Sequence, residues 1–354
     1  MELRHLIGID MLSLEEWKEL YGLCCDIMER PSHYADACRG KVMASLFFEP
    51  STRTNFSFQT AIMRLGGSVF GFSDPNATST AKGETLMDTL RMCSAYSDTV
   101  VVRSPYEGAA LAASLYSEVP VINAGDGAHM HPTQTLTDLV TITRLRGSIG
   151  GIKVGICGDL KNGRTVHSLI QGLSKFPDVK YYLISPRELA LPGYMLSYLK
   201  TSGQWFIEVT NLESTLPQLD VLYMTRIQKE RCINQEEYER NKGVYILTSR
   251  KLKLAKKDML IMHPLPRVDE ISLDVDSDPR AVYFEQARNG MFIRMALLLK
   301  LMYMDRIPAP PPKSTTKLVC SAEKCITKFE PALPKLSIMR DEALRCLYCD
   351  RELE

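Results

Sequence analysis

Three hydroxyl side chains and one guanidinium lie together at the predicted start of a helix. They follow a strand-like run at 42–48, and a helical pattern continues from them to Leu65. The first backbone N–H groups of a helix lack partners within the helix, and the helix dipole is positive there, so this position favours an anion. A single serine or threonine would be an ordinary N-cap, but an arginine fork beside several hydroxyls favours phosphate. The predicted phosphate site consists of Ser51, Thr52, Arg53 and Thr54.

Further polar side chains follow other strand-like runs, at the points where those strands end. Ligand sites of parallel α/β sheets lie beyond the carboxyl ends of the strands. One arginine in such a place is usually a surface group, but several collected there indicate a substrate with more than one negative charge. The candidates are Arg103, His131, Gln134, Arg164, Arg226, Gln228, His263 and Arg267.

The sequence lacks the motifs of several other catalytic classes. It contains no H-E-x-x-H zinc motif, no G-x-x-x-x-G-K-[ST] phosphate loop and no G-x-S-x-G nucleophile elbow. No nucleophile lies beside an evident base. We therefore expect a site that works by positioning and electrostatic stabilisation, without a catalytic metal.

Short apolar runs alternate with helical patterns along most of the chain, which predicts buried parallel strands covered by helices. A capping box at Ser13–Glu16 opens the first helix, and further helices are expected at 84–96 and 289–304. The predicted fold class is α/β, with two doubly wound parallel-sheet domains plus a small four-cysteine zinc-binding β module. The expected strands lie at 41–48, 99–102, 119–122, 151–157, 180–184, 220–224, 244–247 and 259–262.

Composition and pattern divide the chain into four parts. The first domain, 1–146, contains the predicted phosphate site and is completed by a closing helix at 289–305, while the second domain spans 147–288. Four prolines within five residues make 306–317 a stiff, extended linker. The remaining residues, 318–354, form a separate small module.

Bulk composition limits the function classes. The chain has 354 residues, 45% of them hydrophobic, which is enough for a sizeable core. A formal net charge of +1 gives no reason to expect nucleic acid or a membrane surface as a partner. No apolar run approaches the roughly 20 residues of a membrane-spanning helix, and the first residues lack the apolar core of a signal peptide. We expect a cytoplasmic protein.

Four of the ten cysteines crowd the end of the chain. Cys320, Cys325, Cys346 and Cys349 have the C-x4-C-x20-C-x2-C spacing of a structural zinc site, one ion per chain. Disulfide pairing is the alternative, which a reducing compartment disfavours. A module of this size cannot bury enough core to fold alone, whereas zinc could supply roughly 10–16 kcal/mol of apparent binding free energy. The other six cysteines are expected to be small buried groups.

Several segments, in order and over residues 1 to about 305, resemble the carbamoyltransferases, and aspartate carbamoyltransferases in particular. The signature of carbamoyl-phosphate binding is similar to Phe48 through Thr54 together with Arg64-Leu65-Gly66-Gly67. The other matching segments are Lys82-Gly83-Glu84, His131-Pro132-Thr133-Gln134, Gly158 through Ser168, Met224 through Arg231 and His263-Pro264-Leu265-Pro266-Arg267.

The resemblance implies a reaction in which the α-amine of L-aspartate attacks the carbonyl carbon of carbamoyl phosphate, an early step of pyrimidine synthesis. N-carbamoyl-L-aspartate and phosphate are the implied products. Residues 1–146 would then bind carbamoyl phosphate, with its phosphate on Ser51, Thr52, Arg53 and Thr54. Thr54, Arg103 and His131 would stabilise the charge that develops on the carbonyl oxygen, and Gln134 would bind the carbamoyl amide. The leaving phosphate can itself take the amine proton.

The resemblance also implies the residues that bind aspartate, in the domain 147–288. Arg164, Arg226 and Gln228 would hold its two carboxylates, and the backbone at Leu265 and Pro266 would line the closed site. Lys82 would reach the active site of a neighbouring chain, which implies a homotrimer. Either Thr78 or Ser79 takes the place of a serine that commonly precedes this lysine.

The cysteine module resembles the zinc domain of the regulatory chain of bacterial and archaeal aspartate carbamoyltransferases. That chain carries a nucleotide-binding domain before its zinc domain, whereas only the proline linker occupies this place here. We therefore hypothesise that the zinc module serves assembly, including assembly beyond a trimer, or stability, and that nucleotide feedback is absent.

Two other functions are compatible with parts of the pattern. A carbamoyltransferase for another amine such as ornithine would need a site for a cationic side chain. Arg226 would repel an ammonium group, and Thr133 stands where ornithine enzymes typically carry a cysteine. A non-catalytic partner protein is the second alternative, and the intact set of predicted catalytic residues argues against it.

Overall fold

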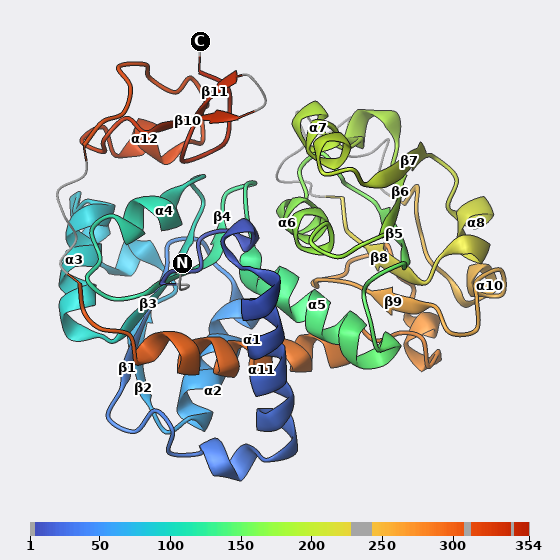
Figure 1. Ribbon diagram of the computed structural model, residues 1–354, viewed down its shortest axis with the longest axis horizontal. Helices are drawn as coiled ribbons and strands as arrows, with labels where there is room; N and C mark the ends of the chain where they lie inside the picture. The colour runs from blue at the N-terminus through green and yellow to red at the C-terminus, as the bar shows by residue number, and fades with distance from the viewer. Residues whose placement is uncertain (1–3, 228–242, 308–312, 341–342, 354) are drawn as a thin grey trace. The chain divides into compact units, whose positions relative to one another are not determined.

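The computed structural model describes residues 4–227, 243–307, 313–340 and 343–353, and the chain folds as two compact units (Figure 1). The first unit comprises Met1–Thr133 and Met291–Glu354, and the second comprises Gln134–Gly290. The chain passes between the units within two helices, α5 (Pro132–Arg146) and α11 (Tyr283–Met302). The predicted domain boundaries near 146 and 288 stay a prediction. Gln228 lies outside the described residues.

The first unit is built on a parallel sheet with the strand order β2-β1-β3-β4. Its strands are β1 (Val42–Phe47), β2 (Ser68–Phe72), β3 (Thr99–Ser104) and β4 (Val121–Asp126). The strands predicted near 41–48, 99–102 and 119–122 are confirmed. Sequence reasoning missed β2, which is an edge strand with a half-exposed pattern and a glycine in the middle. From β1 the chain moves outward to β2 and then returns to β3 on the other side, so the sheet is doubly wound.

The helices of the first unit begin and end at recognisable signals. They are α1 (Leu14–Glu29), α2 (Thr52–Arg64), α3 (Leu86–Tyr96) and α4 (Ala109–Ser114), with short 3-10 turns between some of them. The predicted capping box is present, because Glu16 N–H donates to Ser13 Oγ and Ser13 N–H donates to Glu16 Oε2. Gly66, with φ of +79°, follows the last turn of α2 and ends the helix.

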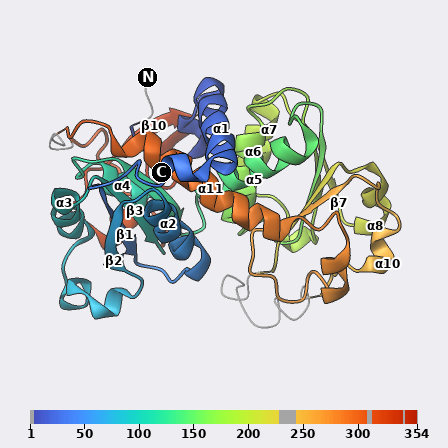
Figure 2. The same cartoon turned by 90° about the horizontal axis from the view of Figure 1, so that it is seen from below.

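The first part of α1 lies beside the last part of α11 (Figures 1 and 2). Lys300 Nζ of α11 donates to Glu19 Oε2 of α1 at 2.6 Å. The predicted closing helix is therefore present, but α11 begins at Tyr283, six residues before the predicted start at 289. Within the described ranges, we find no helix that is both long enough and apolar enough to cross a membrane.

The second unit contains a five-stranded parallel sheet in the order β7-β6-β5-β8-β9. Its strands are β5 (Lys153–Cys157), β6 (Lys180–Ile184), β7 (Trp205–Val209), β8 (Val221–Met224) and β9 (Leu260–Met262). The described helices are α6 (Arg164–Leu173), α7 (Gly193–Thr201), α8 (Leu212–Thr215) and α10 (Ser249–Leu252). The strand predicted at 244–247 is wrong, since only an isolated bridge joins Leu247 to Ile271. The edge strand β7 was not predicted.

The cysteine module contains α12 (Ile326–Phe329) and an antiparallel pair of strands, β10 (Ser337–Arg340) and β11 (Ala343–Cys346). Its apolar side chains belong to the same buried cluster as residues of the first sheet and of α4. Cys325, Ile326 and Tyr348 are members from the module, while Val100 and Ala109 are members from the rest of the unit. The module is therefore packed onto the first unit of its own chain (Figure 1).

Candidate active site and cysteine cluster

The predicted phosphate site lies at the N-terminus of α2, directly after the switch point of the first sheet. The switch point is the place between β1 and β3 where the strand order reverses, and ligands of doubly wound sheets bind there. Ser51 is the N-cap residue, with extended backbone, but its side chain makes no capping hydrogen bond. Thr52 and Arg53 are exposed, while Thr54 is half-buried. The helix start thus presents hydroxyls and a guanidinium outward.

Arg103 is the next-to-last residue of β3, on the other side of this switch point, and it is buried. One of its guanidinium nitrogens lies 3.0 Å from Glu49 Oε2, and the other terminal nitrogen donates to the Ala124 carbonyl at 3.2 Å. Glu49 belongs to the turn that leads into the phosphate site. The contact with Glu49 holds Arg103 close to the turn that leads into α2.

His131 is buried directly before α5, at the end of a loop that Asp126 stabilises. The Asp126 carboxylate accepts hydrogen bonds from the backbone N–H groups of Gly108 and Met130, at 2.8 and 3.0 Å. It also accepts from Asn123 Nδ2 at 3.0 Å. The loops that follow β3 and β4 therefore both donate hydrogen bonds to the Asp126 carboxylate. These bonds fix the backbone that leads to His131.

Arg294 is a buried residue of the first unit that sequence reasoning missed. Its guanidinium donates to Ser57 Oγ of α2 at 3.0 Å and contacts Thr133 Oγ1 at 3.5 Å. It also lies over the Phe58 ring, 5.2 Å from the ring centroid. Arg294 connects the helix of the phosphate site with the segment that follows His131. The signal in the sequence that could have identified Arg294 is the position of an arginine within the apolar run of the closing helix.

The second unit places two predicted aspartate-binding arginines at its own switch point, between β5 and β8. Arg164 begins α6 after β5, and Arg226 follows β8. Gly158, with φ of +127°, lets the two strand ends approach, because a Cβ there would lie 2.3 Å from the Thr225 carbonyl oxygen. The loops carrying both arginines are thus neighbours.

The segment predicted to line the closed site has an unusual backbone. Leu265 has a positive φ of 55°, and the peptide bond to Pro266 is cis. The Leu265 N–H donates to His263 Nδ1 at 2.8 Å, which requires an unprotonated Nδ1. His263 Nε2 then carries the proton and donates to Glu270 Oε1 at 2.6 Å. The ring therefore orients the backbone of the loop.

The ionisation of the His263–Glu270 pair agrees with that hydrogen bonding. Burial lowers the pKa of His263 despite the opposing carboxylate, so the ring is neutral. Burial alone would raise the pKa of Glu270, but the hydrogen bond from His263 and backbone N–H donors lower it. We favour a neutral imidazole beside an ionised carboxylate, since a protonated Nδ1 could not accept from Leu265.

Two further residues of the predicted site, Gln134 and Lys82, lie in a helix and in a loop, respectively. Gln134 lies in the first turn of α5 and donates from Nε2 to Asp138 Oδ1 at 2.8 Å. Lys82 is exposed and ends a 3-10 turn (Ser79–Lys82) in the segment between β2 and α3. Thr78 caps this turn, accepting from Thr80 N–H. Lys82 thus lies on an exposed loop, and its predicted reach to a neighbouring chain stays a prediction.

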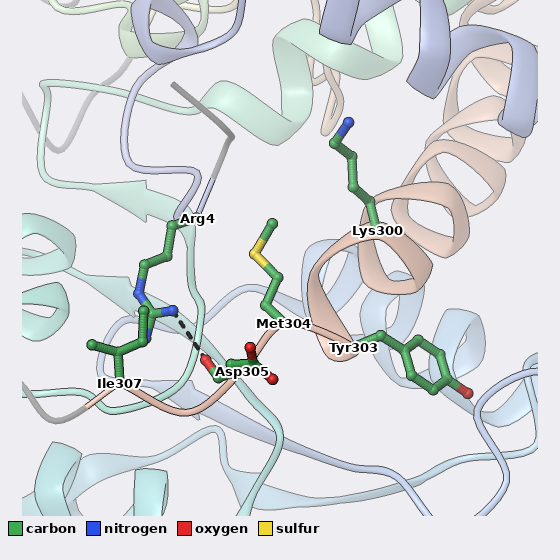
Figure 3. Close-up of a pocket in the computed structure, with 6 residues that line it drawn as sticks. All are labelled: Arg4, Lys300, Tyr303, Met304, Asp305 and Ile307. Carbon is green, nitrogen blue, oxygen red and sulfur yellow. Dashed lines mark hydrogen bonds between the residues drawn. The ribbon is translucent and has the colours of Figure 1, made fainter.

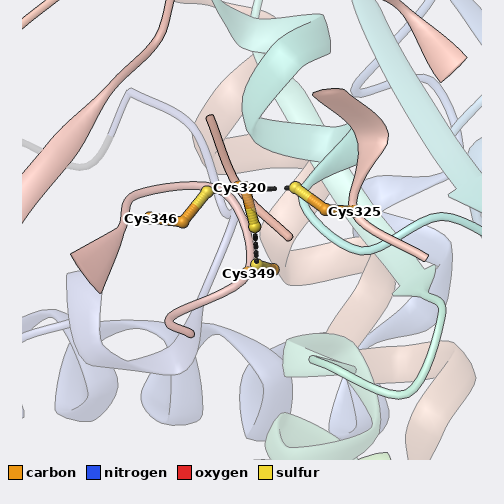
Figure 4. A group of neighbouring side chains, drawn as sticks. All are labelled: Cys320, Cys325, Cys346 and Cys349. Atoms are coloured by element: carbon orange, nitrogen blue, oxygen red, sulfur yellow. Dashed lines mark hydrogen bonds between the residues drawn. The ribbon is translucent and has the colours of Figure 1, made fainter. Parts of the chain in front are cut away.

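The four clustered cysteines are buried and their sulfur atoms all lie within 4.8 Å of one another (Figure 4). Cys320 Sγ lies 3.5 Å from Cys349 Sγ, and Cys325 Sγ lies 3.9 Å from Cys346 Sγ. These are free thiols rather than disulfides. Four thiolates about 2.3 Å from a tetrahedral ion would be roughly 3.8 Å apart, so the donor set and its size fit a metal ion.

The cysteine module is attached to the loop that follows Arg103. Glu107 pairs with the module as a strand would, accepting from Ile326 N–H and donating its own N–H to the Lys324 carbonyl, both at 2.9 Å. Tyr106 stacks on Phe329 with ring centroids 3.6 Å apart. Gly108 has φ of +81°, and a Cβ on it would lie 2.4 Å from Tyr348 Cβ. No side chain fits there.

Two acidic side chains complete this attachment. Glu330 of the module accepts from the Leu86 N–H at 2.6 Å, at the first residue of α3. Asp350 contacts His129 Nε2 at 3.1 Å, while His129 Nδ1 lies 3.3 Å from Asp126. The module therefore contacts the loops after β3 and β4 and the start of α3.

A cavity of about 540 Å³ lies at the C-terminus of α11, away from the strand ends that carry the predicted site residues (Figure 3). Its cationic side chains already have partners. Arg4 donates to the carbonyls of Asp305 and Glu118, and Lys300 donates to Glu19. The cavity contains no residue of the predicted site. Its lining residues are Arg4, Lys300, Tyr303, Met304, Asp305 and Ile307.

Two doubly wound sheets, each with basic side chains at its switch point, define a two-domain α/β enzyme that acts on anionic substrates. A family model described as the carbamoyl-phosphate-binding domain of aspartate/ornithine carbamoyltransferases matches residues 4–144. A second model, described as the Asp/Orn-binding domain, matches residues 150–301. The chain belongs to the aspartate/ornithine carbamoyltransferase family.

The individual relatives described next are named for aspartate rather than ornithine. The chain is 53% identical over 302 residues to the aspartate carbamoyltransferase catalytic subunit of Clostridium novyi, covering 85% of this chain and 99% of the relative. The crystallised catalytic subunit of M. jannaschii aspartate transcarbamoylase is 48% identical with a TM-score of 0.79, over 84% of this chain and 98% of that one.

A third similar structure is aspartate transcarbamoylase of Trypanosoma cruzi in complex with carbamoyl phosphate and aspartate. It is 38% identical with a TM-score of 0.79, and the match covers 84% of this chain and 95% of that one. Both family-model matches end by residue 301, so the cysteine module lies outside them.

Proposed function

We propose that the protein transfers the carbamoyl group of carbamoyl phosphate to the α-amine of L-aspartate, in pyrimidine biosynthesis. The products are N-carbamoyl-L-aspartate and phosphate. The main support for this proposal is the arrangement of side chains at the start of α2. Ser51, Thr52, Arg53 and Thr54 lie there, at the switch point and close to Arg103. The family and the names of the relatives support the same reaction.

In the first unit, the phosphate binds at the N-terminus of α2, where backbone N–H groups, hydroxyls and Arg53 provide donors. Thr54, Arg103 and His131 donate to the carbonyl oxygen as negative charge develops on it. Gln134, which is the first residue of the second unit, accepts from the carbamoyl amide. The departing phosphate takes the proton of the amine, so this chain needs no separate base.

In the second unit, Arg164, Arg226 and Gln228 bind the two carboxylates of aspartate, and the backbone of Leu265 and Pro266 lines the site. Arginine forks suit carboxylates because they donate two parallel hydrogen bonds. Lys82 acts in the site of a neighbouring chain, so the active form is a homotrimer. A sedimentation measurement that gave an active monomer would contradict this part.

The cysteine cluster holds one structural zinc ion through Cys320, Cys325, Cys346 and Cys349, and the module serves stability or assembly. The burial of four thiols within 4.8 Å of one another supports a metal site. Nucleotide feedback is absent, because the proline linker replaces a nucleotide-binding domain. A shift of the aspartate saturation curve by CTP or ATP would contradict that absence.

The reaction is tested by measuring N-carbamoyl-L-aspartate formed by the wild type, Arg53→Ala and Arg39→Ala. Arg39 is the matched control, since it is an exposed arginine of the same unit that lies outside the predicted site and pairs with the exposed Asp36. We expect Arg53→Ala to lower kcat/KM by about 10²-fold or more, and Arg39→Ala to remain close to wild type. Equal activity of Arg53→Ala and wild type would overturn the mechanism. Carbamoylation of ornithine instead of aspartate would overturn the substrate.

A further inference from the structure

A buried carboxylate in the second unit receives hydrogen bonds from two glutamine side chains and one tyrosine. Asp138 lies on α5, one helical turn after Gln134, and has no exposed surface. Its Oδ1 accepts from Gln134 Nε2 at 2.8 Å and from Gln286 Nε2 at 2.7 Å. Its Oδ2 accepts from the Tyr223 hydroxyl at 3.0 Å. Both glutamines are therefore attached to one oxygen atom.

The chemistry of the carboxylate fixes which end of each amide faces it. An ionised carboxylate can only accept hydrogen bonds, so each glutamine must turn its NH₂ group toward Asp138. The carbonyl oxygen of each amide then faces the other way. Gln286 shows the consequence, because its Oε1 accepts from the His263 N–H at 3.0 Å. Burial and the charge of Asp138 raise the pKa of Tyr223, so that its phenol keeps the donated proton.

The same network reaches the loop predicted to line the closed site. From Asp138 it passes through Gln286 to the His263 backbone, and the His263 ring accepts from the Leu265 N–H at 2.8 Å. All of these residues lie within the second unit. One carboxylate thus fixes both the Gln134 amide and, through two further hydrogen bonds, the backbone of Leu265.

We propose that Asp138 is a positioning residue that presents the Gln134 carbonyl oxygen, rather than its NH₂ group, to the amide of carbamoyl phosphate. An NH₂ group on the substrate needs an acceptor, and a glutamine free to rotate would offer its own NH₂ about as readily. Asp138 removes the wrong orientation before the substrate binds. This inference rests on the proposed function, in which Gln134 binds the carbamoyl amide.

The test compares carbamoyl phosphate with acetyl phosphate, which has the same carbonyl and phosphate but a methyl group in place of the NH₂. Binding of both compounds is measured by calorimetry for the wild type, Gln134→Ala and Asp138→Leu. We expect the wild type to prefer carbamoyl phosphate, and each variant to lose about tenfold of that preference. Affinity for acetyl phosphate should change little, since neither variant alters the predicted phosphate site.

Tyr181→Phe is the matched control for loss of a buried polar contact in the same unit. The Tyr181 hydroxyl is bonded to Ser174 Oγ and the Ile170 carbonyl, apart from this network. It should keep the wild-type preference. If Asp138→Leu does not fold, Asp138→Ser, which leaves space for water, replaces it with the same expectation.

A double variant distinguishes positioning from general support of the fold. If Asp138 acts through Gln134, the Asp138 substitution should cause no further loss of preference when Gln134 is already alanine. The inference would be overturned if the losses of preference in the two single variants multiplied in the double variant. It would also be overturned by a folded Asp138 variant that kept the wild-type preference. If the wild type itself binds carbamoyl phosphate no better than acetyl phosphate and makes no carbamoyl aspartate, the proposed function fails instead.

Discussion

The predicted substrate-binding residues and the cysteine cluster are positioned in different ways. Arg103 and the start of α2 stand at the ends of strands whose residues are almost all buried in the first sheet. Among its described residues, the cysteine module has one short helix and two short strands, and its apolar side chains belong to the core of the first unit. The predicted substrate site is therefore supported by a large core, whereas the module shares its small core with the rest of the first unit and is proposed to bind a metal ion as well.

The largest expected effect is on catalysis, with the module unchanged. Arg103→Ala removes a predicted donor to the carbonyl oxygen and should lower kcat/KM by about 10²- to 10³-fold. Metal content per chain should remain that of the wild type. A variant that lost metal together with activity would show that the two regions are coupled, contrary to this expectation.

The next effect is on the metal. Cys325→Ser removes one of four ligands, and we expect the metal to be lost during dialysis against a chelator. Because structural zinc contributes roughly 10–16 kcal/mol in small domains, amide hydrogen exchange in 318–353 should rise strongly. Cys25→Ser, a half-buried cysteine of α1, is the control. Full metal retention by Cys325→Ser would contradict the assigned ligand set.

A smaller effect separates docking from metal binding. Gly108→Val places a side chain against Tyr348 and forces a valine to a φ of +81°, at a cost of about 1–3 kcal/mol. We expect faster hydrogen exchange where the module meets the loop at 105–108, with the metal still bound. Loss of the metal in this variant would mean that the module cannot fold away from its host surface.

The smallest effect concerns Glu330, which accepts from the first N–H of α3. Burial raises its pKa, so the folded protein retains a proton at pH values where the unfolded chain has released it. Its contribution to the unfolding free energy therefore falls as the pH rises through and above the ordinary glutamate range. Glu330→Gln cannot ionise, so its stability relative to wild type should increase over that rise in urea titrations. A difference that stays constant with pH would contradict this.

Strong local patterns in the sequence were enough to predict the central strands and the first helix. Buried runs such as 180–184 and the capping box at Ser13–Glu16 are local signals, and both are present. The edge strands β2 and β7 were missed because each is partly exposed, so neither is a continuous apolar run. The false strand at 244–247 contains Tyr245 and Leu247, whose burial in the second core produced an apolar pattern with a single isolated bridge in place of a paired strand.

The candidate residues could be named from sequence because they follow strand ends, but their supporting groups could not. Arg294 and Asp138 lie within helices and bond to residues far along the chain or on a neighbouring turn. Spacing alone does not reveal which carboxylate will face an amide. Such partners depend on how helices pack.

The sequence by itself determined most of the alternation of strands and helices, and it was enough to predict an anion site at the start of α2 and a cluster of four cysteines, because each is a short-range pattern of residue types. Only the tertiary structure decided that the cysteine module packs on the loops after β3 and β4, and that Asp138 orients two glutamines. These features arise from contacts between residues up to more than 200 positions apart. Such contacts form only when the sheets and helices bring distant surfaces together.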